Sequence, residues 1–161
     1  MDSIKFSNYF KVRILRDDAI IFEDELSNGV TIEGKNELLD TMFKAATQST
    51  WYCGLMAIST VLSEDDTMAS HAGWTEFTDY SEANRQTWVA DAAVDASIEN
   101  PSTAYIEFTA TASAEIPGIF ITSNNTISGT TGVLWATGNF NAAPTPAIGD
   151  VVQVQYIVNV N

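Results

Sequence analysis

The chain closes with Val151-Val152-Gln153-Val154-Gln155-Tyr156-Ile157-Val158-Asn159-Val160-Asn161, the stretch with the clearest periodicity in the sequence. Its even-numbered positions from 152 to 160 are apolar, and Gln153, Gln155 and Asn159 alternate with them. A period of two residues is typical of a β-strand that buries one face and leaves the other polar. We therefore expect a β-strand here, and the rest of the chain repeats the pattern.

The N-terminal part of the chain carries the same two-residue period. Residues 9–16 alternate apolar and basic side chains, and residues 19–26 form a second run after the turn-forming pair Asp17-Asp18. The pair Asn28-Gly29 is the strongest short hairpin motif, because both residues tolerate a positive φ. We expect residues 30–33 to pair back on the second strand.

Short apolar or alternating runs, separated by turn residues, continue to the C-terminus. Further strands are expected at residues 51–60, 87–92, 94–98, 104–112, 116–122 and 133–140. About ten short strands at this spacing predict a mainly β protein, an antiparallel β-sandwich of the jelly-roll type. We expect residues 17–161 to form this single β-sandwich domain and residues 1–16 to be an N-terminal arm or a first strand.

One short α-helix is expected near residues 36–46. Asn36 is a suitable N-cap for it. One face of the 3.6-residue period is apolar and holds Leu38, Leu39, Met42, Phe43 and Ala46. Because this face is short and uncharged, we expect it to lie against the core.

Composition and charge exclude several classes of protein. The chain has 161 residues, of which 45% are apolar and 17% charged, so its composition is that of a folded globular domain. No stretch approaches the roughly 18 consecutive apolar residues of a transmembrane helix. The net charge of −14 disfavours direct contact with nucleic acid, because phosphate recognition needs Lys and Arg. We expect neither nucleic acid nor a membrane as a partner.

The single cysteine, Cys53, excludes an internal disulfide framework. Residues 1–6 lack the apolar segment and the cleavage site of a secretory signal. Both features fit synthesis in a reducing cytoplasm. Cys53 lies in the apolar run 51–60, where a thiol is expected to be buried and unreactive.

Residues 66–88 hold the only histidine, His71, together with four large aromatic side chains. Asp65, Asp66 and Glu76 lie near His71 in the sequence and suggest a base and its orienting group, but no nucleophile or oxyanion site accompanies them. We interpret residues 66–88 as a long connection without catalytic chemistry, containing a helical turn at residues 67–72. The connection is expected to be fastened to the β core by its rings, Trp74, Phe77, Tyr80 and Trp88.

Metal and glycan sites are weaker alternatives. The acidic runs at residues 64–66 and 17–18 lack the alternate spacing and the glycine of a calcium loop, so we expect solvated loops there. We expect no metal, no cofactor and no catalytic residue. Exposed rings on a β-sandwich can stack on sugars, although core packing is favoured for the four tryptophans, Trp51, Trp74, Trp88 and Trp135.

Basic side chains gather near the N-terminus. After Arg85 the sequence contains only acidic charges. A basic arm followed by an acidic body suits pairing with another copy or docking on an acidic partner. The alternative is that the basic residues are solvated positions on an ordinary strand. Four of the seven Lys and Arg residues lie in the first sixteen positions: Lys5, Lys11, Arg13 and Arg16.

Four stretches taken together resemble a known group of proteins. They are residues 37–40 with 47–55, residues 66–77, residues 119–122 leading to 129–132, and the strand that begins at Gly149-Asp150. The most specific part is Ser70-His71-Ala72-Gly73-Trp74-Thr75-Glu76-Phe77. In order and spacing these stretches resemble small tailed-bacteriophage virion structural proteins, usually found among head and structural genes. The resemblance covers roughly residues 30–161.

The resemblance implies a non-enzymatic bacteriophage virion structural protein, in the first place a capsid decoration (cement) protein that binds the outside of the head and stabilises it. The implied partners are the major capsid protein and further copies of the chain in a homotrimer. The implied location is the capsid surface of the virion, after synthesis in the host cytoplasm. The alternatives are another virion component (a head fibre, tail or adaptor protein) and a glycan-binding β-sandwich module.

Within this hypothesis, the N-terminal residues are candidates for a capsid-contact arm. An arm makes no contribution to the core, so we expect a chain without residues 1–16 to keep its fold. The candidate contact residues are Lys5, Phe6, Tyr9, Lys11, Arg13 and Arg16.

Overall fold

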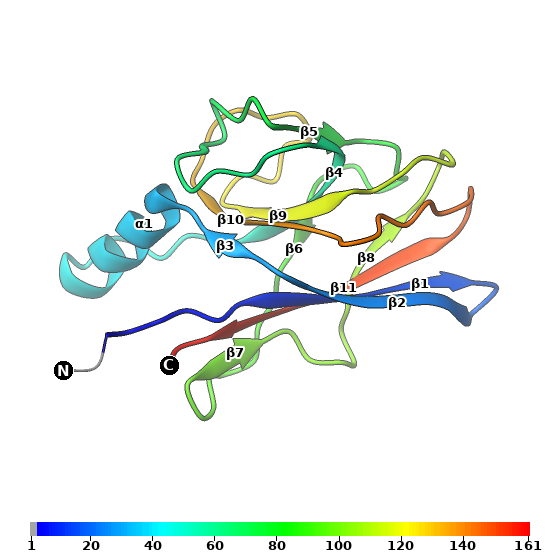
Figure 1. The fold of residues 1–161 in the computed structure, drawn as a ribbon. Helices are drawn as coiled ribbons and strands as arrows, with labels where there is room; N and C mark the ends of the chain where they lie inside the picture. The colour runs from blue at the N-terminus through cyan, green and yellow to red at the C-terminus, as the bar shows by residue number, and fades with distance from the viewer. Residues whose placement is uncertain (1–2) are drawn as a thin grey trace.

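Two antiparallel sheets face each other in the computed structural model, which describes residues 3–161 (Figure 1). The first sheet has the strand order β2 (Ala19–Ser27), β1 (Tyr9–Arg16), β11 (Val151–Asn159) and β7 (Ser97–Glu99), with β8 (Ile106–Thr109) also paired to β11. The second has the order β3 (Gly29–Val30), β10 (Leu134–Asn139), β9 (Gly118–Thr122), β4 (Tyr52–Ser59) and β5 (Trp74–Phe77), with β6 (Gln86–Thr87) also paired to β4. The expected fold class, a mainly β antiparallel sandwich with one short helix, is confirmed.

The core between the sheets follows from the alternation of β1 and β11. Phe10 and Val12 of β1 are buried, and they pair with Tyr156 and Val154 of β11, which are also buried. The rings of Phe10 and Tyr156 stack with centroids 4.6 Å apart. Since β1 lies between β2 and β11, residues 9–16 are a strand of the sheet. Removal of residues 1–16, of which residues 1 and 2 lie outside the described part of the chain, would take buried side chains out of the core. This packing argues against the expectation that the fold survives the deletion.

The turn at Asp17-Asp18 and the expected turn at Asn28-Gly29 behave differently. Asp17 and Asp18 both have positive φ, at 51° and 62°, as a tight turn between β1 and β2 requires. Gly29 is not among the positive-φ residues, and β3 pairs with β10 instead of returning to β2. The hairpin expected there is wrong: the chain crosses from the first sheet to the second at Asn28.

The helix α1 (Ile32–Phe43) begins four residues before the expected start. Thr31 caps it, because its Oγ1 accepts a hydrogen bond from the backbone N–H of Gly34 at 3.0 Å. The Thr31 hydroxyl also donates to the carbonyl of Leu134, and Glu33 Oε2 accepts from the N–H of Leu134 at 2.9 Å. These contacts fasten the first turn of α1 to β10, so the expected cap at Asn36 is wrong.

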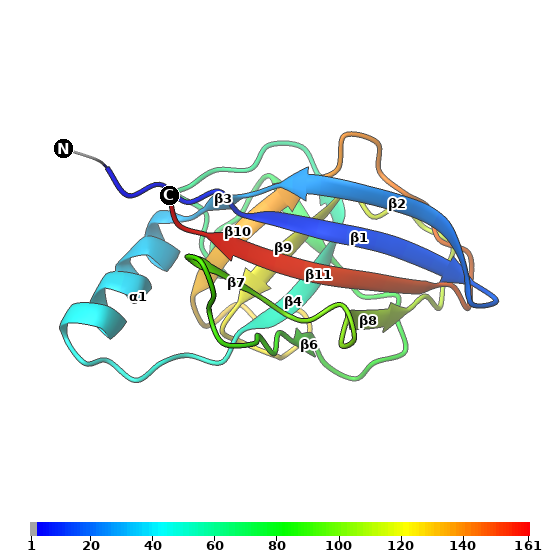
Figure 2. The same ribbon diagram turned by 90° about the horizontal axis from the view of Figure 1, so that it is seen from below.

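The apolar side of α1 is largely exposed. Leu38 is partly buried against the core, whereas Leu39 is 52%, Met42 66% and Phe43 74% exposed. Ala46 lies beyond the end of α1 and is exposed as well, so the expectation that this side faces the core is wrong for four of its five residues. The cause is the anchoring at the first turn, since α1 projects from that point beyond the end of the sheets (Figures 1 and 2).

The connection at residues 66–88 is fastened to the sandwich by its rings, as expected. Trp74, Phe77 and Tyr80 are buried, and Trp88 is partly buried against the core. The connection also contains β5, a short strand that the sequence did not predict, and β6, which overlaps the strand expected at residues 87–92 only at Thr87. The helical turn expected at residues 67–72 is wrong, because Thr67 and Ser70 form a tight turn closed by reciprocal backbone hydrogen bonds.

Candidate functional site

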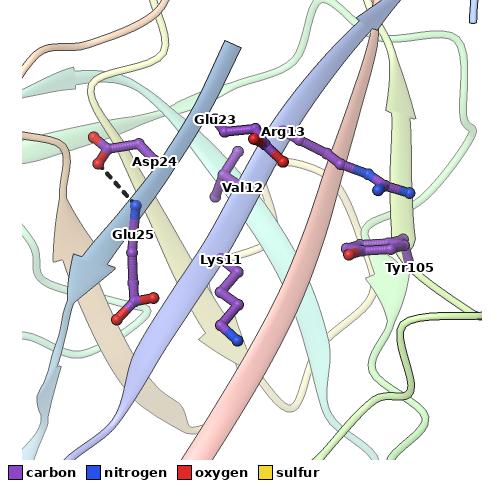
Figure 3. Close-up of a pocket in the computed structure, with 7 residues that line it drawn as sticks. All are labelled: Lys11, Val12, Arg13, Glu23, Asp24, Glu25 and Tyr105. Atoms are coloured by element: carbon purple, nitrogen blue, oxygen red, sulfur yellow. Dashed lines mark hydrogen bonds between the residues drawn. The ribbon is translucent and has the colours of Figure 1, made fainter. Parts of the chain in front are cut away.

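A polar depression lies on the outer face of the first sheet, across β1 and β2 (Figure 3). The two-residue period sends Lys11 and Arg13 to this face while Val12 points into the core. The antiparallel register places Lys11 opposite Glu25 and Arg13 opposite Glu23. The depression has a volume of about 260 Å³ and is lined by Lys11, Val12, Arg13, Glu23, Asp24, Glu25 and Tyr105.

Arg13 contacts side chains from β11 and from the residue before β8, and it lies opposite a residue of β2. Its Nε donates to Gln153 Oε1, and Gln153 Nε2 donates to Glu107 Oε1. Its guanidinium carbon lies 4.1 Å from the centroid of the Tyr105 ring, the stacking visible in Figure 3. With Glu23 on its other side, Arg13 belongs to a polar row that runs across β2, β1, β11 and β8. This geometry fixes the cation within the sheet surface.

Arg16 is used within the chain. Its Nε and Nη2 donate to the two carboxylate oxygens of Asp150, each at 2.8 Å. Asp150 is 2% exposed and also accepts from the N–H of Ala147 at 2.8 Å. The hydrogen bond from Arg16 lowers the pKa of the Asp150 carboxyl below its ordinary value, and the same pair raises the pKa of Arg16. The pair closes the loop that leads into β11.

Lys5 and Phe6 are also tied to the sandwich. Lys5 and Asn161 exchange two backbone hydrogen bonds of 2.8 Å, and Phe6 forms a bridge with Val160. The Phe6 ring packs edge-on against Trp135 with centroids 6.1 Å apart. The six sequence-derived candidates therefore lie along β1 and its lead-in and do not form a free arm. Sequence reasoning missed the residues that complete their surface, because these come from other strands and from the residue before β8: Glu23, Glu25, Glu107, Gln153 and Tyr105.

A second depression, of about 280 Å³, lies over the outer face of the second sheet and includes His71, Glu76 and Arg85. Arg85 Nε and Nη2 each donate to Glu76 at 2.8 Å, in an ion pair whose side chains are 1% and 8% exposed. Arg85 also donates to the carbonyls of Asn124 and Gly129. Every nitrogen of the guanidinium thus has a partner, and the pair fastens the loop after β9.

His71 is packed rather than poised for chemistry. Its ring stacks on Trp74 with centroids 3.8 Å apart, and its Nδ1 lies 3.0 Å from the Trp74 carbonyl oxygen. Asp66 is occupied by hydrogen bonds from Trp74 Nε1 and from the N–H of Ser63. The carboxylates near His71 in sequence therefore serve the packing of this connection, as the rings around them do.

The remaining sequence candidates are also placed by the fold. Cys53 is fully buried, and burial raises the pKa of its thiol, which keeps it protonated at neutral pH. Trp74 and Trp135 are buried, while Trp51 and Trp88 are partly buried against the core. Within residues 3–161, no three His, Cys, Asp or Glu side chains are grouped as metal ligands. In the same part of the chain, no helix is both long and apolar enough to span a membrane.

An apolar surface on α1 is a second candidate for a contact with another molecule. Residues 32, 39, 42 and 43 share one side of the helix by its 3.6-residue period. All four are exposed, from 42% for Ile32 to 74% for Phe43. We call this surface the α1 face: Ile32, Leu39, Met42 and Phe43.

Comparison with known proteins gave no relative: no family model, no curated protein and no solved structure matches the chain.

Proposed function

We propose that the chain is a non-enzymatic structural protein of a bacteriophage virion, in the first place a capsid decoration protein on the outside of the head. The observation that carries this proposal is the α1 face. A folded domain seldom leaves several large apolar side chains together in water, and such a surface marks a contact with another macromolecule. Figure 2 shows α1 at the end of the sandwich. Its side chains Leu39, Met42 and Phe43 are exposed and therefore accessible to a partner.

A cement protein stabilises a shell by adding contact area across the boundaries between its subunits. Such a role needs at least two contact surfaces on one rigid body. The α1 face offers an apolar surface, and the outer face of the first sheet offers a polar one with Lys11, Arg13, Glu23 and Glu25. The resemblance of residues 30–161 to virion proteins supports a phage head as the assembly. In it, the chain would contact the major capsid protein and two further copies of itself in a homotrimer.

The test is binding to mature phage heads from which the protein is missing. We expect the purified chain to co-sediment with these heads and to raise the temperature at which they release DNA. The triple variant Leu39→Ser, Met42→Ser and Phe43→Ser should bind at least about tenfold more weakly, because it loses the apolar contact. Failure of the unmodified chain to bind heads would overturn the proposal.

A matched control separates the α1 face from apolar exposure in general. Val61, Val89 and Val94 are 69%, 66% and 67% exposed, and all three lie outside the helix. Their combined replacement by serine removes three exposed apolar side chains elsewhere on the chain. We expect this variant to bind heads like the unmodified protein. Equal weakening in both variants would show that the α1 face has no special part in attachment.

Cross-linking within intact particles locates the protein in the virion. Lys5 and Lys11 are exposed and available to amine-reactive linkers. Decoration predicts links from these lysines to the major capsid protein. Links to tail proteins alone would move the function to another virion component.

A further inference from the structure

The first sheet has a long free edge at β2. Within residues 3–161, β2 pairs with β1 on one side, and no strand pairs with it on the other. β2 has nine residues, whereas the other edge strands of the two sheets, β3, β5, β6, β7 and β8, have four or fewer. Folded proteins keep edges short or cover them, because unpaired backbone groups accept another strand. A long open edge is therefore a feature to explain.

We propose that this edge binds an extended, basic segment of another protein by adding it to the first sheet as a further strand. The proposal concerns the chemistry of the edge and does not depend on the virion assignment. It commits to a segment with Lys or Arg at alternate positions. Strand addition of this kind takes affinity from backbone hydrogen bonds and specificity from every second side chain.

The backbone of β2 offers hydrogen-bonding groups to a partner. The N–H of Glu25 donates to Asp24 Oδ1 at 2.8 Å rather than to β1, and the N–H of Asn28 donates to Asn8 at 3.2 Å. In an antiparallel pair, successive residues alternate between bonding the neighbour and pointing away from it. From Asn28 this alternation directs the backbone groups of Glu25 and Glu23 away from β1. An added strand would meet these groups, and one of its carbonyls would replace Asp24 Oδ1 as the acceptor for the N–H of Glu25.

The side chains at the same positions define the partner. Glu23 and Glu25 are exposed on the outer face of the sheet, two residues apart. On the side of β2 that pairs with β1, Glu23 is opposite Arg13 and Glu25 is opposite Lys11, so the two basic residues are also two positions apart. Opposite charges directly across two strands are stabilising. The chain thus contains, in β1, an example of the sequence pattern that suits the free side of β2.

A second copy of β2 does not suit this edge. Antiparallel pairing of two β2 strands around their centres would bring the acidic residues 23–25 of each copy together. Like charges across strands are destabilising, and the net charge of −14 adds a general repulsion between copies. At a bulge between the pairs Ile14–Phe22 and Leu15–Ile20, Ile21 has no partner in β1, and such a bulge further twists the edge away from flat self-pairing. Charge complementarity therefore favours a cationic partner.

Two fluorescein-labelled peptides test the proposal. The probe has the sequence of residues 9–16, Tyr-Phe-Lys-Val-Arg-Ile-Leu-Arg. The comparison peptide carries glutamate in place of the lysine and of the first arginine. Fluorescence anisotropy with the full chain should show saturable binding of the probe, weakened by added salt, and at least about tenfold weaker binding of the acidic peptide. Equal affinity of the two peptides, or no binding of either, would overturn the proposal.

A charge-reversal variant places the binding on β2. Glu23→Lys with Glu25→Lys should weaken probe binding at least about tenfold. The matched control is Asp91→Lys with Glu115→Lys, which changes the net charge equally at two exposed positions outside β2. We expect the control to bind like the unmodified chain. If both variants bound the probe equally weakly, the effect would come from the overall charge of the chain, and the proposal would be overturned.

Amide chemical shifts of the unmodified chain give a measurement that needs no substitution. Bound probe should shift the amides of Glu23 and Glu25 and slow their hydrogen exchange, while those of β11 stay unchanged. Shifts in β11 would mean that the probe displaces β1, and shifts in α1 would mean a different site. A dimer in the absence of probe, dissolved by the Glu23→Lys and Glu25→Lys variant, would identify a second copy as the occupant. Shifts in β11, shifts in α1 and a dimer of this kind would each contradict the proposal.

Discussion

The outer faces of the two sheets differ in what covers them. Over β1 and β2 the outer face of the first sheet is polar, with Lys11, Arg13, Glu23 and Glu25, and Lys11, Glu23 and Glu25 are exposed to solvent. The outer face of the second sheet is apolar and is covered by the chain's own connections. A polar face needs no cover, whereas an apolar face must be buried by something.

The cover of the second sheet is built from the connection between β4 and β5. Met68 lies in this connection, and Trp74 is the first residue of β5, where the connection ends. Both pack on Met56, Phe120 and Leu134 of the sheet and form a second apolar cluster with them. Phe120 lies over Gly54 of the neighbouring strand, where a Cβ atom would approach the ring to 2.2 Å. The Arg85 guanidinium carbon lies 5.2 Å from the Phe120 ring centroid and so belongs to the same layer. The sandwich therefore has a third layer on this side.

The α1 face breaks the pattern set by the second sheet. The Met68 side chain is 2% exposed, whereas the Met42 side chain is 66% exposed. Both side chains are equally apolar, so the difference lies only in whether this chain supplies the cover. The bare surface is the one that another molecule can cover, which is why it carries the proposed function.

The largest expected effect comes from breaking the ion pair beneath the cover. Arg85→Ala leaves the Glu76 carboxylate buried without its cation and removes the donors to Asn124 and Gly129. We expect a loss of about 3–5 kcal/mol in the free energy of unfolding, measured by urea denaturation at pH 7. The control is Lys35→Ala, whose half-exposed pair with Glu64 should contribute less than about 1 kcal/mol. Similar losses in both variants would mean that the cover is not held by its buried pair.

The methionine pair tests the covered and the bare apolar surface with the same substitution. Met68→Ala removes buried apolar volume and leaves a cavity, so we expect it to cost about 2–4 kcal/mol of unfolding free energy. Met42→Ala should change it by less than about 0.5 kcal/mol, because the side chain is already in water and alanine favours the helix. Thermal and urea unfolding measure both. A cost at Met42 equal to that at Met68 would show that α1 is packed in solution.

The smallest effect is expected at the rim of the open sheet, where Arg16 pairs with Asp150. The pKa of Asp150 is lowered in the folded state, so its contribution to stability is present above the ordinary carboxyl value of about 4 and is lost as the pH falls through the folded pKa. Asp150→Asn should lower Tm by about 2–4 °C at pH 7. The difference in Tm between the Asp150→Asn variant and the unmodified chain should become smaller below about pH 4.

A pH series of thermal melts decides this last expectation. The control is Asp91→Asn at an exposed position, which should leave the melting curve unchanged. A gap between Asp150→Asn and the unmodified chain that stays constant from pH 7 to pH 3 would mean that the carboxylate charge is not what stabilises the pair.

Strand positions were predictable wherever one face is buried and the other is wet. β1 alternates in sequence because alternate residues meet water. In β11 the alternate residues Gln153 and Gln155 are buried but donate hydrogen bonds to Glu107 and to the carbonyl of Asn100, and the limits of both strands were close to those expected. β9 has no exposed residue, so its sequence is a continuous apolar run rather than an alternating one. Such a run predicts a strand but not which residues face the core and which face the third layer.

The helix and the turn at Asn28-Gly29 show where local patterns misled. The apolar period of residues 38–46 predicts an amphipathic helix, but it contains no information on whether the core lies within reach. Asn28-Gly29 permits a tight turn, yet the backbone hydrogen bonds of β3 to β10 outweigh that local preference. The polar row around Arg13 could not be foreseen either, since Glu107 and Gln153 join it only through strand pairing.

The sequence by itself determined the class of fold, the buried faces of its regular strands and the structural role of the rings in residues 66–88. Those properties depend on local periodicity and on the size of apolar side chains, which are readable along the chain. Only the tertiary structure decided which sheet each strand joins, that the second sheet is covered, and that the α1 face and the β2 edge are not. Those properties depend on contacts between residues far apart in sequence, and no local pattern encodes them.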